Sequence, residues 1–154
     1  MTDAQSNDEV FRKHVDELMR FATGLVGPFD AADVVNDACL SAFAARAWPD
    51  VADRRAYLYR SVLNTARSVR RSDLRRHLRE LKTAPAESVT DSHTDLDVLV
   101  AVDRLSTQQR AVVVLTYWED LTVSAVAERL GISAGSVKRH LHRARSRLKE
   151  WLDE

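Results

Sequence analysis

Residues 122–145 read TVSAVAERLGISAGSVKRHLHRAR, and their apolar spacing predicts two helices joined by a tight turn. Thr122 and Ser133 are residue types that cap helix starts, and Gly131 is placed to end the first helix. The first helix has its apolar residues at helical spacing: Val123, Val126, Ala127 and Leu130. The second helix also has apolar residues at helical spacing, which share one face: Val137, Leu141, Ala144 and Leu148. The stretch therefore predicts a helix-turn-helix, whose second helix is pushed outward.

The opposite face of the second helix is polar and basic. Its central side chains suit base edges in the major groove of DNA: Ser136, Arg139, His140 and Arg143. Lys138 and Arg145 project from the flanks, where a phosphate needs only a cation. The alternative is that these charges form an ordinary solvated helix surface. His140 and His142 point in diverging directions on a helix, so we expect no metal site there.

Two features precede this stretch. Ser106-Thr107-Gln108-Gln109 has the spacing of a capping box, which predicts a helix from there to about Trp118. Residues 83–97 contain Pro85 and several Ser, Thr and Asp residues, which is typical of a flexible acidic linker. We therefore expect a second helical domain over residues 98–152.

The first part of the chain predicts three more helices. Apolar residues near helical spacing indicate a helix over residues 8–23, before Gly24 and the Gly27-Pro28 break. Asp30 is a candidate N-cap for a helix over residues 30–46, which Trp48-Pro49 ends. A long helix follows over residues 54–81, with one apolar stripe: Leu58, Val62, Thr65 and Val69. These helices predict a first domain over residues 8–82.

Composition narrows the class of protein. With 6% aromatic residues, four glycines and three prolines, the chain favours long helices over many short strands. We therefore expect an all-α protein of two small helical domains. The single cysteine, Cys39, excludes an intrachain disulfide. A polar, acidic stretch over residues 1–8 and the lack of a long apolar run predict a cytoplasmic protein without membrane insertion.

Charge is separated along a chain that has no net charge. Residues 54–82 carry ten Lys or Arg against two acids, and residues 135–149 carry six against none. Residues 83–103 carry five acids and no Lys or Arg. Segregation of this kind is typical of opposed binding surfaces, and it predicts contact with nucleic acid at two places.

The long helix differs chemically from the helix-turn-helix because it brings aromatic and basic side chains together. Its polar stripe contains Arg60, Asn64, Arg67 and Arg71, and Trp48, Tyr57 and Tyr59 lie just before or within its start. Aromatic rings and guanidinium planes stack on unpaired bases, and Asn can read an exposed base edge. This combination favours strand-separated DNA, although each of the three aromatics could equally belong to the core.

A third candidate surface is acidic. Asp33, Asn36, Asp37 and Leu40 fall at positions i, i+3, i+4 and i+7, so they share one helix face that suits a basic protein partner. The alternative is that these acids only complement the positive end of the helix dipole. Paired carboxylates also raise the possibility of acid–base catalysis, but no nucleophile, histidine or Gly-rich loop accompanies them. We therefore do not expect an enzyme.

Together these residues resemble the sigma-70 family, and within it the short extracytoplasmic-function sigma factors. Residues 30–37 (DAADVVND) are similar to the region-two segment that docks on RNA polymerase. Residues 55–60 (RAYLYR) with Asn64 resemble the helix that engages the minus-ten promoter element. Residues 105–110 (LSTQQR) and 131–138 (GISAGSVK) resemble region four, which reads the minus-thirty-five element. The resemblance covers roughly residues 11–76 and 98–152.

The resemblance implies a function and partners that composition alone does not. Core RNA polymerase would bind Asp33, Asn36, Asp37 and Leu40, and the output would be promoter-selective initiation without a cofactor or a small-molecule substrate. Promoter DNA would bind at the minus-ten side through Trp48, Tyr57, Arg60, Asn64, Arg67 and Arg71. The minus-thirty-five side would use Ser136, Lys138, Arg139, His140, Arg143 and Arg145. The family also implies an anti-sigma factor as a further partner.

Some positions depart from the family pattern. Ser68 and Ser124 stand where an acid is frequent, and Ser133 stands where Pro is common, so the promoter sequence is left open. Two other classes compete with a sigma factor. Residues 131–141 also resemble a LuxR-like regulator that binds duplex DNA, which would leave the first half unexplained. A helical adaptor without DNA contact would lack the steep salt dependence of phosphate binding.

Overall fold

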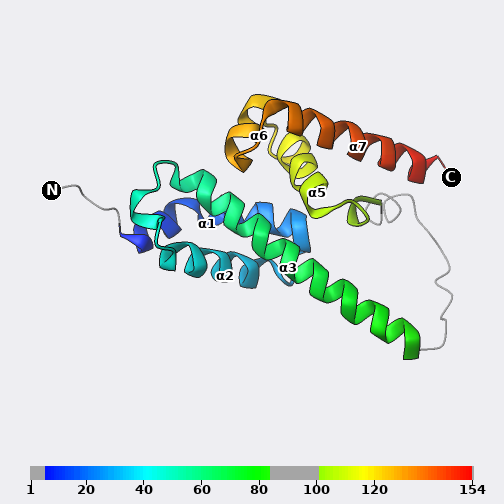
Figure 1. Ribbon diagram of the computed structural model, residues 1–154, viewed down its shortest axis with the longest axis horizontal. Coiled ribbons are helices and arrows are strands. Elements are labelled where there is room, and N and C mark those ends of the chain that lie inside the picture. The colour runs from blue at the N-terminus through cyan, green and yellow to red at the C-terminus, as the bar shows by residue number, and fades with distance from the viewer. Residues whose placement is uncertain (1–5, 84–100, 154) are drawn as a thin grey trace.

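The structure, a computed structural model, describes residues 6–83 and 101–153, and every regular element in these ranges is helical. In the first half, α1 (Asn7–Val26), α2 (Ala31–Ala44) and α3 (Arg54–Thr83) form a three-helix bundle, with a short 3-10 turn η1 (Trp48–Asp50) before α3. The end of α3 extends well beyond the bundle (Figure 1). The predicted all-α class is confirmed, while residues 84–97 of the predicted linker lie outside the described residues.

The first bundle forms because each helix has one apolar face to bury. Phe21 of α1 and Tyr59 of α3 lie at its centre, with ring centroids 4.9 Å apart. The surrounding buried residues come from all three helices: Val10, Leu18, Leu25, Val34, Val35, Leu58, Val62 and Leu63. Burial of these side chains is the main force that holds the three helices together.

Helix ends in the first half agree only in part with the prediction. The helix α1 continues through Gly24 to Val26, so its predicted end at Thr23 was wrong, and Gly27, with φ of 88°, ends it. Asp30 does precede α2, but its own backbone is helical and its side chain makes no capping hydrogen bond. Asp53 provides a cap that sequence reasoning missed, because its Oδ1 accepts from the Ala56 amide at 3.0 Å.

The second half contains α5 (Thr107–Val113), a π-helical turn η2 (Val114–Trp118), α6 (Val123–Leu130) and α7 (Ala134–Leu152). The capping box at Ser106 and Gln109 is confirmed, as are the caps at Thr122 and Ser133. Gly131 ends α6 in the left-handed conformation, with φ of 66°, which a side chain would disfavour. The apolar face of α7 is buried at Val137, Leu141 and Ala144.

The two halves pack against each other over α1 and α3. Contacts join α3 to α5 and α6, and α1 to α5 and η2, while α2 lies on the far side of the bundle (Figure 1). One apolar cluster contains residues of both halves, including Leu58 and Val62 with Leu115, Val126 and Leu130. Within residues 6–83 and 101–153, no helix has the length and apolar character needed to cross a membrane.

Candidate functional site

The acidic face of α2 is fully available to a partner. Asp33, Asn36 and Asp37 are exposed, and Leu40 is 68% exposed although it is a large apolar residue. The opposite face of α2 is buried in the bundle, so the helix presents its polar side outward as predicted. A groove of about 480 Å³ adjoins Asn36 and Leu40, with Phe11 and Phe43 in its lining. Acids beside an apolar groove are suited to a basic protein surface.

The aromatic residues before and within α3 are divided between core and surface. Trp48 is only 3% exposed, and its indole Nε1 donates to Asn7 Oδ1 at 2.9 Å. Its ring packs edge-on against Phe43 and Tyr57, at 5.1 and 5.7 Å between centroids. Tyr59 is also buried, whereas Tyr57 is partly exposed. Of the three aromatics Trp48, Tyr57 and Tyr59, only Tyr57 presents ring surface to a ligand.

The polar stripe of α3 has its predicted arrangement on the helix, but part of it touches the second half. Arg60, Asn64 and Arg71 are exposed, and Arg67 is partly buried because its guanidinium donates to Gln108 of α5. Arg60 lies beside Gly131, where an added Cβ would meet its Nη1 at 2.9 Å. Arg67 and Arg71 also line a groove of about 920 Å³ between α3 and residues 103–108.

The outer face of α7 is basic and mostly free. Lys138, Arg139, Arg143 and Arg145 are exposed, and Ser136 is partly buried. The Arg139 guanidinium donates to Ser136 Oγ at 2.9 Å, which orients both side chains. Arg145 donates to the Tyr117 hydroxyl at 2.6 Å and lies over that ring. These contacts hold two of the predicted DNA-binding cations in fixed directions.

His140 is placed differently from its neighbours on α7. It is partly buried, and its Nδ1 has no hydrogen-bond partner. Burial, together with Arg143, Arg139 and Arg67, lowers the pKa of His140 below its ordinary value of 6.5. Because Arg67 belongs to α3, the environment of His140 includes both halves of the protein. Within residues 6–83 and 101–153, no group of three His, Cys, Asp or Glu residues is arranged to hold a metal ion.

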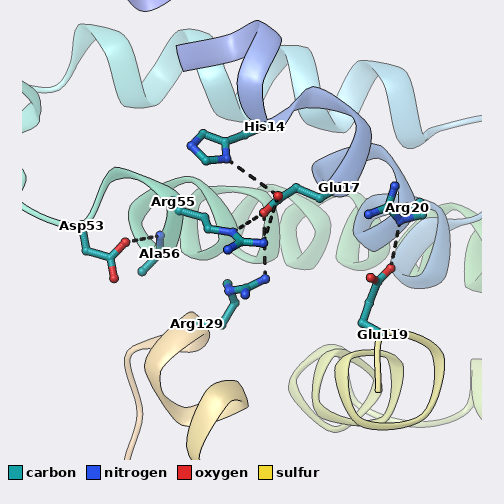
Figure 2. A network of polar contacts seen from close by, with 8 residues as sticks. All are labelled: His14, Glu17, Arg20, Asp53, Arg55, Ala56, Glu119 and Arg129. Atoms are coloured by element: carbon teal, nitrogen blue, oxygen red, sulfur yellow. Dashed lines mark hydrogen bonds and ion pairs between the residues drawn. The ribbon is translucent and has the colours of Figure 1, made fainter. Parts of the chain in front are cut away.

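A polar network between the halves was missed by sequence reasoning. Glu17 of α1 accepts from Arg55 of α3 at 2.5 and 3.0 Å, and Arg129 of α6 approaches the same carboxylate at 3.9 Å (Figure 2). The Arg129 guanidinium also lies 4.8 Å from the centre of the Tyr59 ring. No local pattern links Glu17, Arg55 and Arg129, because they lie on three different helices.

The ionisation of this network follows from burial and charge. Burial acts to raise the pKa of Glu17, but the hydrogen bonds and charge of Arg55 outweigh it and lower that pKa. Burial raises the pKa of Tyr59 to about 12, so its ring faces Arg129 as a neutral phenol. Glu17 is therefore a carboxylate shared by two arginines, and Arg129 is held by one anion and one aromatic face.

Three further arginine contacts join the halves. Arg70 of α3 donates to the carbonyls of Asp103 and Leu105 at 2.7 and 2.9 Å, and to Thr107 Oγ1 at 3.2 Å. Arg110 of α5 donates to the Gly24 carbonyl of α1 at 2.6 Å. Arg20 of α1 pairs with Glu119 at 3.1 Å on a more exposed part of the interface (Figure 2). Arg70, which is not part of the polar stripe of α3, thus gives this helix a further contact with the second half.

Comparison with known proteins connects these elements to a family. Residues 10–79 match the family model described as Sigma-70 region 2, and residues 95–148 match Sigma-70, region 4. The RNA polymerase sigma-E factor of Streptomyces antibioticus is 38% identical over 95% of this chain and 84% of its own length. The ECF RNA polymerase sigma factor SigM of Mycobacterium tuberculosis is 32% identical over 97% of this chain and 79% of its own.

Solved structures agree with these sequence matches. The sigma factor RpoE of Bartonella quintana, solved with the anti-sigma factor NepR, superposes with a TM-score of 0.64 at 24% identity and covers 95% of this chain and 96% of its own. CnrH, solved with the cytosolic domain of CnrY, has a TM-score of 0.59 at 25% identity and covers 99% of this chain and 90% of its own. With both conserved regions present in order, the chain belongs to the sigma-70 family and to its extracytoplasmic-function group of RNA polymerase sigma factors.

Proposed function

We propose that this sigma factor divides its work among three helix surfaces. A sigma factor directs core RNA polymerase to promoters and aids their opening, and it does so as a binding protein rather than as an enzyme. The observation that carries the assignment is that one chain contains regions 2 and 4 in order. Different residues meet polymerase, single-stranded DNA and duplex DNA.

The polymerase surface is the outer face of α2. Asp33, Asn36 and Asp37 supply charge and hydrogen-bond acceptors, and Leu40 supplies an exposed apolar contact at the edge of a groove. Apolar contact surrounded by polar groups is typical of specific protein interfaces. Because α2 lies on the side of the bundle away from the second half, this surface is available in the arrangement described here (Figure 1).

The minus-ten surface is the amino-terminal half of α3 with the turn before it. Arg60, Asn64, Arg67 and Arg71 follow the strand, and Tyr57 stacks on a base. Trp48 supports this surface from within the core through its contact with Tyr57. Unstacking a base costs a few kcal/mol, and each stacking contact returns about 1–3 kcal/mol, so capture of unpaired bases offsets opening without ATP.

The minus-thirty-five surface is the outer face of α7. In the proposed complex Ser136, Arg139, His140 and Arg143 meet base edges, while Lys138 and Arg145 contact phosphates. Residues 8–82 and 98–152 act as separate binding domains, and residues 83–97 set their separation. We also propose that an anti-sigma protein binds this chain in the cytoplasm, because RpoE of Bartonella quintana was solved in complex with one.

Transcription in vitro with sigma-free core polymerase tests the proposal. We expect the wild-type protein to confer defined start sites on a genomic template. The variant with Asp33→Lys and Asp37→Lys should lose assembly with core polymerase, because two attractive charges become repulsive ones. A variant with Asp16→Lys and Asp153→Lys makes the same change of charge at exposed positions away from α2, and it should still assemble.

Two outcomes would contradict the proposal. Unchanged assembly of the α2 variant would remove the polymerase contact from that face. A wild-type protein that binds duplex DNA alone but gives core polymerase no start-site choice would instead be a LuxR-like regulator.

A further inference from the structure

Tyr117 is a large aromatic residue that the fold of the second half leaves at the surface. It lies in the π-helical turn η2 and is 52% exposed, whereas Val114 and Leu115 of the same turn are buried. The Glu119 amide donates to the Val114 carbonyl at 3.2 Å, five residues back, which closes this wide turn. π-Helical turns are rare overall and occur frequently at functional sites. The core therefore does not account for the Tyr117 ring.

The contact that Tyr117 does make is with a cation of α7. Arg145 Nε donates to the Tyr117 hydroxyl at 2.6 Å, and the guanidinium carbon lies 5.6 Å from the centre of the ring. Both side chains are exposed. Among residues 6–83 and 101–153, no carboxylate forms an ion pair with Arg145. Tyr117 thus orients the guanidinium without neutralising its charge.

The pair offers hydrogen-bond donors of two kinds. A tyrosine hydroxyl that accepts a hydrogen bond can still donate its own proton. Arginine has five N–H donors, and the bond to Tyr117 uses the one on Nε. The terminal Nη groups of Arg145 and the hydroxyl proton of Tyr117 therefore remain for an anion. A phosphate accepts from both, and its bonds to a charged guanidinium are roughly twice as strong as bonds between neutral groups.

The pair lies on a flank of α7 that also carries Lys138. Arg145 follows Lys138 by seven residues, so the two cations share one flank about 10 Å apart along the helix axis. Arg139 is about 100° around the helix from Lys138, on the outer face. A helix in the major groove directs its outer face toward base edges, while its flanks meet the phosphates that border the groove. The position of the pair therefore suits backbone contact.

We propose that Tyr117 and Arg145 together form a phosphate site, which extends the minus-thirty-five surface from α7 onto η2. The inference rests on the proposed function, because that function assigns α7 to duplex DNA and Arg145 to a phosphate. It adds Tyr117 as a second donor to the same phosphate and as the residue that positions the guanidinium. The site recognises the DNA backbone, so it strengthens binding without selecting a base sequence.

The salt dependence of holoenzyme binding tests this site. Affinity is measured over a range of salt concentrations for a promoter fragment and for the same fragment with a scrambled minus-thirty-five element. Arg145→Ala should weaken binding to both fragments at least three-fold. The slope of log affinity against log salt should become shallower by about 0.9, as expected for the loss of one phosphate contact.

Tyr117→Phe isolates the hydroxyl, because it keeps the ring. It should weaken binding to both fragments at least two-fold and also make the salt slope shallower, since the guanidinium is no longer held toward the phosphate. Its melting temperature should match that of the wild type, because the hydroxyl is at the surface. A change in stability alone would not alter the salt slope.

Two comparisons separate a coupled pair from a general loss of charge. Tyr117→Phe combined with Arg145→Ala should weaken binding by less than the product of the two single effects, because each group holds the other in place. Lys13→Ala removes an exposed cation of α1, outside the surfaces proposed for DNA, and should leave affinity and slope unchanged.

Three results would overturn the inference. Wild-type salt slopes in both Arg145→Ala and Tyr117→Phe would exclude a phosphate site. Single effects that multiply in the double variant would exclude the positioning role of Tyr117. Losses confined to the fragment with the intact element would assign the pair to base recognition instead. A wild-type holoenzyme without start-site choice would contradict the proposed function, and the same slopes measured for the free protein on duplex DNA would then decide the inference.

Discussion

His14 illustrates at the scale of one residue how burial couples stability to pH. Its Nδ1 lies 3.8 Å from Glu17 Oε2, too far for a hydrogen bond. Burial lowers the pKa of His14 below 6.5, and the charges of Lys13 and Arg55 add to this effect, which outweighs the opposing effect of Glu17. The folded protein therefore binds fewer protons at this residue than the unfolded chain does, so stability falls as the pH drops below about 6.5.

We expect His14→Gln to reduce the loss of thermal stability between pH 7.5 and pH 5.5. His140 has a pKa lowered in the same direction, so a variant that also carries His140→Gln should show a still flatter profile. Melting temperatures across this pH range give the test, and His142→Gln at an exposed position serves as the control. If the double variant keeps the wild-type dependence of melting temperature on pH, groups other than His14 and His140 cause that dependence.

Arg139 is one of the residues that we propose to read base edges from α7. Its guanidinium is exposed and is oriented by Ser136 Oγ, as a side chain that forms bidentate bonds to a base needs to be. Arg139→Ala should reduce holoenzyme affinity for the specific promoter by about 1–3 kcal/mol and relax the choice at one base pair. Lys138→Ala should weaken binding to all sequences alike. Equal losses on every sequence for Arg139→Ala would assign that residue to phosphate.

At the scale of an element, α5 depends on its capping box. The Gln109 amide donates to Ser106 Oγ at 3.1 Å, and the Ser106 amide donates to Gln109 Oε1 at 3.2 Å. Ser106→Ala should lower the free energy of unfolding by about 1–2 kcal/mol, because it leaves a helix amide without its partner. Ser106→Asp preserves a capping oxygen and should cost much less. Urea denaturation of both variants measures the difference, and equal stabilities would exclude the cap as the cause.

Elements with local signals were predictable from the sequence. The caps at Ser106, Thr122 and Ser133 and the left-handed end at Gly131 depend on residues within one helical turn, and all four are observed. Gly24 was not understood, because it was taken as a sign that the first helix had ended. Position 24 has no room for a side chain because Val114, which is distant in sequence, packs against it. Local patterns carry no information about such a contact.

At the scale of the whole molecule, the candidate surfaces were predictable but their mutual placement was not. Exposed acids on α2 and exposed cations on α7 follow from helical periodicity, which fixes the face that each residue occupies. The burial of Trp48 and the engagement of Arg67 with Gln108 depend on how helices pack, so sequence reasoning left the aromatics undecided and assigned Arg67 to DNA without its contact to Gln108.

The shared core predicts that the two halves unfold together, and Arg129 tests how strongly they are coupled. Hydrogen exchange of peptides from α2 and from α7 should report the same urea midpoint in the wild type. Arg129→Ala removes the cation between Glu17 and Tyr59, so the second half should lose about 1–3 kcal/mol of protection before the first half does.

Arg20→Ala breaks another Arg–Glu pair between the halves, but Arg20 is 60% exposed, so its effect should stay below about 1 kcal/mol. If the midpoints of α2 and α7 remain coincident in Arg129→Ala, apolar contacts alone couple the halves. If Arg129→Ala and Arg20→Ala lose equal protection, burial does not set the strength of these ion pairs.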